Sequence, residues 1–199
     1  MKTKSVLFMF IALMGVLVAA GILFRDEFLA FLRRPELYGH ALFAHVVAAT
    51  LFFANAAVGM LWERRSLVSG RKDVILHTYA TVAWLDARLS SPLIILSLVS
   101  GLMLSAIAGD LWQIGWLSVS FILFVFSGLF WILSDIPTQY KVKRLMAALD
   151  PADPDLPDEL TRLLRLRWWI SLAGVAPLVV VFALMVYKPA LPAVATWFR

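Results

Sequence analysis

Long apolar runs, separated by short charged segments, set the pattern of this chain of 199 residues. An apolar run of about 20 residues is long enough to cross the hydrocarbon core of a bilayer as a helix. Runs of this kind predict five transmembrane helices, at residues 5–24, 40–62, 74–108, 116–135 and 168–187. The segment 136–167 is predicted to be a loop that carries short amphipathic helices. The predicted fold class is therefore all-α, a polytopic membrane helix bundle in a single membrane domain, 1–199.

The third predicted span, 74–108, is longer than a bilayer requires. A single helix of this length would extend about 52 Å, whereas the hydrocarbon core is about 30 Å thick. Its first half must therefore tilt, protrude or lie at the interface. Pro92, in the middle of the run, cannot donate a hydrogen bond to the carbonyl oxygen of Arg88, so the sequence predicts a kink there.

The first predicted span, 5–24, differs from a cleaved signal peptide in the length of its apolar run. It follows the basic start Met-Lys-Thr-Lys, which a signal peptide would share. The apolar region of a signal peptide is usually about 7–15 residues long, and this run is longer. We therefore expect a retained transmembrane helix.

The composition agrees with a membrane protein and excludes several kinds of site. Hydrophobic residues make up 62% of the chain and charged residues 16%, which is far from the average of soluble domains. The chain has no cysteine, which excludes a disulfide framework, a thiolate metal site and the attachment of a c-type haem. The net charge of +5 does not indicate a nucleic-acid partner, because the basic residues flank the apolar spans, where lipid headgroups are their expected partners.

The distribution of basic residues predicts the orientation of the chain. The N-terminus and the loops 63–73 and 140–167 together carry twelve Lys and Arg residues, and the segments on the opposite side carry five. Cytoplasmic segments of membrane proteins are enriched in these residues. We therefore expect the N-terminus and the amphipathic helices of segment 136–167 in the cytoplasm, and the C-terminus outside.

Two polar residues mark one face of the second predicted span. At about 100° per residue, His45 and Asn55 fall on the same side of the helix as the small residues Ala41, Ala48 and Gly59. In a bilayer, polar groups and small residues face partner helices rather than acyl chains. This face is therefore predicted to pack against another span.

A matching face is predicted on the third span. Asp86 shares it with small and polar residues that include Ser90 and Gly101. Such residues permit close contact between helices in a bilayer. We expect this face to pack against the face of the second span that carries Asn55.

The charges at membrane depth each require a partner. Asp86 and Arg88 point about 160° apart on a helix, so they cannot pair with each other. The sequence predicts that Arg88 pairs with Asp135, which follows the fourth apolar run. A basic residue of the cytoplasmic loops is predicted to meet Asp86, namely Arg64, Arg65 or Lys141.

Motifs in four of the predicted spans resemble those of one family. They are His45, Phe52 and Ala54-Asn55 in the second span, Asp86, Pro92 and Ser100-Gly101-Leu102 in the third, Trp131 and Ile136-Pro137-Thr138-Gln139 at the end of the fourth, and Leu184 to Pro189 at the end of the last. In this order and spacing they resemble the bacterial integral membrane proteins catalogued as domain of unknown function 2269. The resemblance covers about residues 40–190, which leaves the first span as an addition. Ala54 and Ser100 stand where the family has Gly and Thr.

The resemblance implies a protein of the bacterial inner (cytoplasmic) membrane, but no activity, because the family has none assigned. The layout is more distantly similar to HemJ-type protoporphyrinogen oxidases and to the membrane domain of CopD-type copper-resistance proteins. Both have a histidine near the start of a membrane helix, and HemJ-type proteins bind haem b. The distant similarity implies haem b or a related tetrapyrrole as a cofactor, with His45 as its ligand.

His45 is the strongest candidate for a cofactor or metal ligand, and a structural role is the alternative. It lies about 7 Å below the outer end of its helix, and ionisable groups inside a membrane are often functional. The alternative is a neutral imidazole that hydrogen-bonds to a neighbouring helix. His77 is predicted near the opposite surface and cannot share an iron with His45, whereas His40 is expected to be exposed at the helix end.

Lys188 lies at the outer end of the last predicted span and has two interpretations. Its long side chain can reach the lipid headgroups. Alternatively, its ammonium group pairs with a haem propionate. The second interpretation makes Lys188 a cofactor-binding residue together with His45.

Two functions remain open from the sequence. The first is an integral membrane protein that binds haem b or a related tetrapyrrole and acts in electron transfer or haem metabolism. The alternative is a non-enzymatic membrane accessory or assembly subunit, or a small-solute permease, built around the faces of Asn55 and Asp86. The lipid bilayer is the expected partner; other membrane proteins or further copies of this chain are left open, as is enzyme activity.

Overall fold

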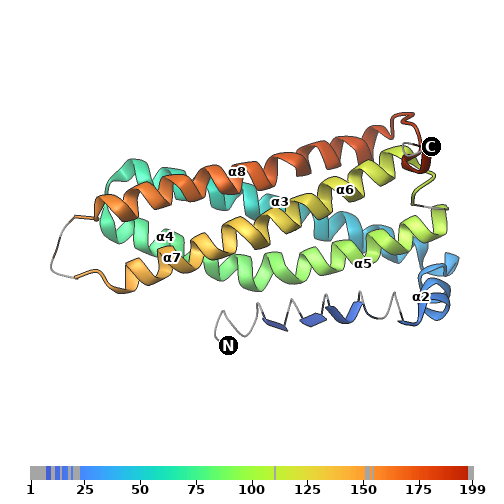
Figure 1. The fold of residues 1–199 in the computed structure, drawn as a ribbon, viewed down its shortest axis with the longest axis horizontal. Coiled ribbons are helices and arrows are strands. Elements are labelled where there is room, and N and C mark those ends of the chain that lie inside the picture. Colours follow the sequence, from blue (N-terminus) through green and yellow to red (C-terminus); the bar gives the residue numbers. More distant parts are fainter. Residues whose placement is uncertain are drawn as a thin grey trace. The chain divides into compact units, whose positions relative to one another are not determined.

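Helices make up all the regular elements among the described residues of the computed structural model. The described part excludes residues 1–7, 10, 11, 14, 18, 20–22, 110, 151, 152, 154 and 197–199. The α-helices are α2 (Arg25–Leu32), α3 (Tyr38–Ser69), α4 (Lys72–Leu85), α5 (Ser91–Ala108), α6 (Gly115–Phe130), α7 (Ile136–Ala147) and α8 (Asp158–Tyr187), as Figure 1 shows. Single turns of 3₁₀-helix lie at η1 (Pro35–Leu37) and η4 (Val194–Thr196).

Four helical stretches within the described residues are long and apolar enough to cross a membrane. They are Pro35–Ser69, Lys72–Ala108, Gly115–Ala147 and Asp158–Tyr187. These stretches contain most of the second to fifth predicted spans. Half of the positions of the first predicted span, 5–24, lie outside the described residues. The all-α membrane fold class predicted from the sequence is confirmed.

The sequence predicted two separate short helices in the loop 136–167, at about 139–149 and 157–167, and the structure does not have them. Helix α8 runs without interruption from Asp158 to Tyr187, so it joins the second of these segments to the last span. Helix α7 follows α6 through a short π-helical segment, with no loop between them. The prediction ended each span at its charged residues. A helix can continue beyond the hydrocarbon region, however, because its backbone hydrogen bonds remain satisfied within the helix.

Polar residues are buried and many large apolar residues are exposed, which is the reverse of a soluble protein. The buried polar residues within the described part are mostly serines, joined by Glu63, Asp135 and Arg167. Exposed apolar side chains include Phe43 (72% exposed) and Leu133 (73% exposed). Small hydroxyl side chains allow helices to pack closely, and apolar side chains suit contact with acyl chains. This distribution is that of helices surrounded by lipid.

Two π-helical segments interrupt the long helical stretches, each just before a proline. They are η2 (Asp86–Ser90), followed by Ser91-Pro92, and η3 (Trp131–Asp135), followed by Ile136-Pro137. In both, the backbone N–H before the proline donates five residues back, from Ser91 to Asp86 and from Ile136 to Trp131. Proline lacks an N–H and clashes with the preceding turn of an α-helix, so a wider turn accommodates it. The first of these segments lies where the sequence predicted a kink.

The chain consists of two compact units. Unit 1 comprises Met1–Asn55, Trp84–Ser118 and Pro189–Arg199, and unit 2 comprises Ala56–Ala83 and Val119–Lys188. Within unit 1, α2 packs against α5. The C-terminal segment of unit 1 is also joined to the turn before α6, because the N–H of Ala195 donates to the carbonyl oxygen of Trp112 at 3.3 Å.

Unit 2 has a small core of its own. Helices α7 and α8 pack against each other. Side chains of α4, α7 and α8 form a buried cluster, which consists of Ile75, Tyr79, Val142, Leu160 and Leu164. This cluster holds the ends of three helices together beside the polar residues described below.

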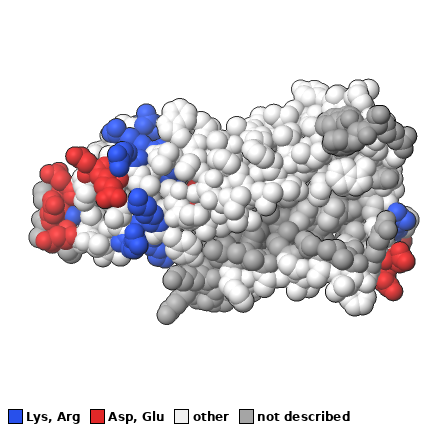
Figure 2. Space-filling model, viewed as in Figure 1, with Lys and Arg blue, Asp and Glu red and all other residues white. Residues whose placement is uncertain are grey.

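Basic side chains gather on the surface of unit 2. Helix α7 and the first turns of α8 expose Lys141, Lys143, Arg144, Arg162 and Arg165. Figure 2 shows Lys and Arg side chains collected in one zone of the surface, with acidic side chains beside them. Such a zone suits contact with anionic lipid headgroups at a membrane interface.

Candidate functional site

His45 on α3 is held by the backbone of α5, within unit 1. Its Nδ1 atom lies 2.8 Å from the carbonyl oxygen of Ser97. A carbonyl oxygen can only accept a hydrogen bond, so Nδ1 carries the hydrogen. In the neutral ring, Nε2 is then the atom with the free lone pair. His45 itself is half-buried.

Gly101 provides the space that the imidazole occupies. It lies one helical turn after Ser97, on the same face of α5. A Cβ atom at this position would lie 2.9 Å from Cε1 and 3.1 Å from Nδ1 of His45, closer than real Cβ contacts. The glycine is therefore needed for the ring to reach the backbone of α5.

The geometry of His45 leaves one ring nitrogen available for a ligand. Among the described residues, Nε2 has no hydrogen-bond partner. Metal-ligating histidines usually donate their other ring N–H to a carbonyl or carboxylate, which fixes the ring and its tautomer. The described residues contain no group of three or more His, Cys, Asp or Glu side chains that could hold a metal ion. Among these residues, His45 is therefore not part of such a metal-binding group.

A second polar group of unit 1 lies where α3 meets the π-helical segment η2. Asn55 Nδ2 donates to Asp86 Oδ1 at 3.4 Å and to Ser90 Oγ at 2.9 Å. Asp86 and Ser90 are four residues apart, so both side chains face the same amide. These contacts confirm that the face carrying Asn55 packs against the face carrying Asp86.

The prediction that Asp135 pairs with Arg88 was wrong. The ion partner of Asp135 is Arg167 of α8, with Nε of Arg167 3.6 Å from Oδ1 of Asp135. The predicted partner, Arg88, lies with its guanidinium carbon 4.9 Å from the ring centre of Trp84. The prediction treated Arg167 as a loop residue, although it lies within α8, where it can reach Asp135.

Two of the three residues predicted to meet Asp86 have other partners. Lys141 pairs with Glu159 at 3.6 Å on the surface of unit 2. The guanidinium carbon of Arg64 lies 5.9 Å from the ring centre of Trp168. Asp86 accepts the amide hydrogen of Asn55, and its predicted contact with Arg65 stays a prediction.

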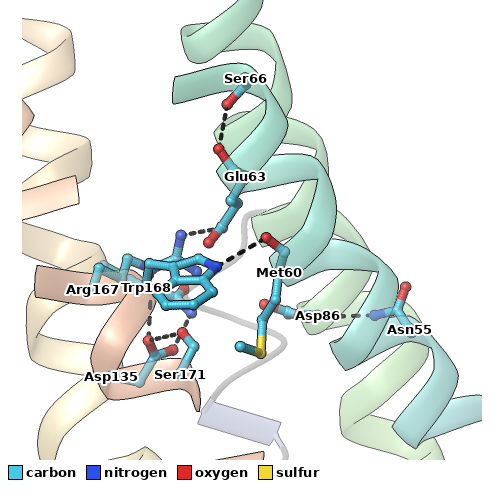
Figure 3. Close-up of polar contacts among 10 residues, drawn as sticks. Asn55, Met60, Glu63, Ser66, Asp86, Asp135, Arg167, Trp168 and Ser171 are labelled. Atoms are coloured by element: carbon cyan, nitrogen blue, oxygen red, sulfur yellow. Dashed lines mark hydrogen bonds and ion pairs between the residues drawn. The ribbon is translucent and has the colours of Figure 1, made fainter. Parts of the chain in front are cut away.

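A buried ion cluster lies in unit 2, and Figure 3 shows how its side chains converge. Arg167 Nη1 donates to Glu63 Oε1, and Arg167 also pairs with Asp135. All three side chains are almost completely buried: the residues are 1% (Glu63), 3% (Asp135) and 3% (Arg167) exposed. Three separate helical stretches therefore contribute one charged group each to one enclosed site.

Neighbouring side chains complete this ion cluster. Asp135 accepts hydrogen bonds from Ser171 Oγ at 3.2 Å and from Gln139 Nε2 at 2.6 Å. The guanidinium carbon of Arg167 lies 5.2 Å from the ring centre of Tyr79. Asp135 thus has neutral donors in addition to Arg167, whereas the only side-chain partner of the Glu63 carboxyl among the described residues is Arg167.

Sequence reasoning missed Glu63 and Arg167. Both were assigned to basic loops because each lies just beyond an apolar run. The neighbouring tryptophans, Trp62 and Trp168, were a signal that these positions lie in helices near a membrane interface rather than in open loops. Trp168 indeed anchors its helix by donating from Nε1 to the carbonyl oxygen of Met60 at 3.2 Å.

The other sequence candidates have exposed positions. His40 lies exposed near the start of α3, and His77 lies exposed on α4. Lys188 follows the last residue of α8, with a left-handed backbone (φ 44°) and an N–H that donates to the carbonyl oxygen of Leu184 at 3.0 Å. Its side chain is exposed, as expected for a residue at a membrane interface.

Comparison with known protein families settles the classification of the chain. A family model described as "Predicted integral membrane protein (DUF2269)" matches residues 40–189. The chain belongs to this family. No curated protein and no solved structure matches the chain.

The family match agrees with the helices described above. It identifies the chain as an integral membrane protein with several spans. The matched range contains His45, Asn55, Asp86 and the whole buried ion cluster. The first predicted span lies before it.

Proposed function

We propose that this membrane protein binds haem b or a related tetrapyrrole through His45. The observation that carries the proposal is the hydrogen bond from Nδ1 of His45 to the carbonyl oxygen of Ser97. This bond fixes the ring and leaves the lone pair of Nε2 for an iron atom. A single histidine suffices as the protein ligand of a haem, so the proposal needs no second ligand from the chain.

The surroundings of His45 fit this role. The half-buried ring is packed on the glycine side of α5, and the helices expose broad apolar surfaces that suit a tetrapyrrole ring. When bound, a haem would supply one-electron redox chemistry, which is the basis for a role in electron transfer or haem metabolism.

The proposal includes a location in the bacterial inner membrane with the N-terminus in the cytoplasm. It rests on the excess of basic residues in the segments 63–73 and 140–167. The exposed basic residues of α7 and α8 support it, since they would then face the anionic cytoplasmic leaflet.

A second function is favoured by the contacts of Asn55. Asn55, Asp86 and Ser90 join two helices through polar side chains at a π-helical segment, and such segments are frequent at functional sites. This arrangement supports a small-solute permease or a non-enzymatic accessory or assembly subunit. Neither of these roles requires a cofactor.

An absorption spectrum separates the two functions. The protein would be produced with an ample supply of haem and purified in detergent. The first proposal predicts a Soret band that is lost in His45→Ala and largely retained in His40→Ala and His77→Ala, since those histidines are exposed and lie elsewhere. A colourless wild-type protein would contradict tetrapyrrole binding and would favour the second function, which needs no cofactor.

A further inference from the structure

The buried ion cluster of unit 2 has an uneven set of charges. It contains two carboxyl groups, Glu63 and Asp135, and one guanidinium group, Arg167. With both carboxyls ionised, the cluster would carry a net charge of −1. No further Lys or Arg contacts Glu63 or Asp135 among the described residues.

Burial makes such an excess charge unfavourable. The three residues are at most 3% exposed, so water cannot solvate the charge. Two carboxylates in one enclosed site cannot both ionise without strong repulsion unless enough positive charge is present. One more positive charge must therefore enter the cluster, or one carboxyl must be neutral.

A proton suits the cluster better than a metal ion does. The guanidinium group lies between the carboxyls and repels other cations. Only two acidic side chains are available, and metal ions such as Ca²⁺ and Mg²⁺ need about six oxygen ligands. A proton needs a single oxygen atom and neutralises the excess charge completely.

We propose that Glu63, Asp135 and Arg167 form a buried proton-binding site in which the two carboxyls share one proton. Asp135 has donors in Ser171 and Gln139 that stabilise its ionised form. Glu63 has only Arg167.

Tyr79 supports the assignment independently. It is 3% exposed, its ring faces Arg167, and its hydroxyl has no hydrogen-bond partner in the described part of the chain. Buried hydroxyls normally have a partner, and a trapped water often provides it. A hydroxyl of this kind beside the cluster is suited to bind a water molecule that carries the proton in or out.

The proton would link helix packing to pH. The cluster joins α3, the segment η3 and α8, and Tyr79 of α4 lies against it. With the proton bound, these helices meet around a neutral cluster. Its loss leaves an excess negative charge between them, which weakens their packing. This site needs no bound tetrapyrrole.

Infrared spectroscopy tests the shared proton directly, because a protonated carboxyl has a C=O band separate from that of a carboxylate. We expect wild-type protein at neutral pH to show such a band. It should disappear in Glu63→Gln and equally in Asp135→Asn, since either change leaves one carboxylate balanced by Arg167. Glu159→Gln is the matched control, because this carboxyl is exposed and pairs with Lys141, and its spectrum should keep the band.

The pH dependence of stability provides the second readout. A pair that keeps a proton in the folded state binds more protons than the unfolded chain does, above the range near pH 4 in which free carboxyls titrate. The melting temperature of the wild type should therefore fall as pH rises and the cluster releases its proton. Glu63→Gln and Asp135→Asn should lose this fall, and Glu159→Gln should keep it.

The proposal would be overturned by a wild-type spectrum that matches both variants in the protonated-carboxyl region. It would equally be overturned if either folded variant kept the wild-type dependence of melting temperature on pH. The wild-type spectrum alone decides the matter if a variant does not fold, because absence of any protonated-carboxyl band at neutral pH excludes the shared proton.

Discussion

His45 and Arg167 are both held by a neighbouring helix, but the partners differ in charge. His45 donates to the neutral carbonyl oxygen of Ser97, which leaves Nε2 able to bind a ligand. Arg167 forms ion pairs with two carboxyls, so one positive charge faces two acidic groups. At the scale of single residues, the first contact is the basis of the proposed ligand, and the second is the basis of the proposed proton-binding site.

Gly101→Ala should disturb the contact between His45 and α5. The new Cβ would lie 2.9 Å from Cε1 of His45, so the ring must move away from Ser97. Overpacking of this kind typically lowers the free energy of unfolding by about 1–3 kcal/mol. The change can be measured as the free energy of unfolding in mixed detergent micelles.

Gly128→Ala is the control for this substitution. No atom lies within 4 Å of the Cβ position at Gly128 in α6, so only the helix propensity changes. Its stability should equal or slightly exceed that of the wild type. Equal stability of the two variants would show that the space at Gly101 is not needed by His45.

At the scale of secondary-structure elements, the two π-helical segments distinguish these helices from regular transmembrane α-helices. Each precedes a proline and contributes an acidic residue to a polar site: Asp86 from η2 and Asp135 from η3. A π-turn includes one residue more than an α-turn between hydrogen-bonded groups. Removing one residue from such a segment should convert it to an ordinary α-helical turn. The residues that follow should then keep their faces on the helix.

Deletion of Leu89 should therefore still allow folding, at a lower stability, because Pro92 would then follow an α-turn. Leu89 lies in η2 and is 38% exposed, so its loss removes little packing. Deletion of Leu96 in α5, which is 46% exposed, is the matched control. It should rotate the rest of α5 by about 100° and prevent folding.

The comparison can be made by size-exclusion chromatography in detergent. We expect a monodisperse peak for the deletion of Leu89 and aggregation for the deletion of Leu96. If both deletions aggregate, the π-turn is not a removable insertion.

The sequence predicted the helices well but not their ends. Apolar runs determine which segments can lie in lipid, so the all-α membrane fold follows from them directly. The start of the last helix was misplaced, because the charged Arg167 was taken to lie outside it. Arg167 can be buried within α8 because Glu63 and Asp135 balance its charge. Its pairing with Asp135 depends on how separate helices pack, which periodicity along one helix does not determine.

The candidate site was predictable only in part, for the same reason. The face of Asn55 was correctly matched to that of Asp86, because small and polar residues on two helices indicate contact. The partner of His45 is a backbone carbonyl, which every residue has, so the side chains along α5 could not identify Ser97.

Many large apolar side chains are exposed along the described helices, while buried polar groups lie at helix contacts within each unit. This distribution and the family match make the chain an integral membrane protein. The basic residues of α7 and α8 and the charge bias of the sequence then predict which side faces the cytoplasm.

Reporter fusions test this orientation. Alkaline phosphatase fused after Arg199 should be active, because it would lie in the periplasm. A fluorescent protein inserted in segment 149–157 should fluoresce, because it would lie in the cytoplasm. The reverse pattern would contradict the proposed orientation, whether or not residues 5–24 form a span.

The role of His45 as a tetrapyrrole ligand is tested most directly by His45→Gly, which leaves a space of the shape of the ring beside Gly101. The absorption spectrum of this variant, purified from cells supplied with haem, would be recorded before and after imidazole is added. We predict that the Soret band of the wild type is absent from the variant and returns when free imidazole replaces the missing side chain. A variant with the full wild-type band before imidazole is added, or a wild-type protein with no Soret band, would contradict the account.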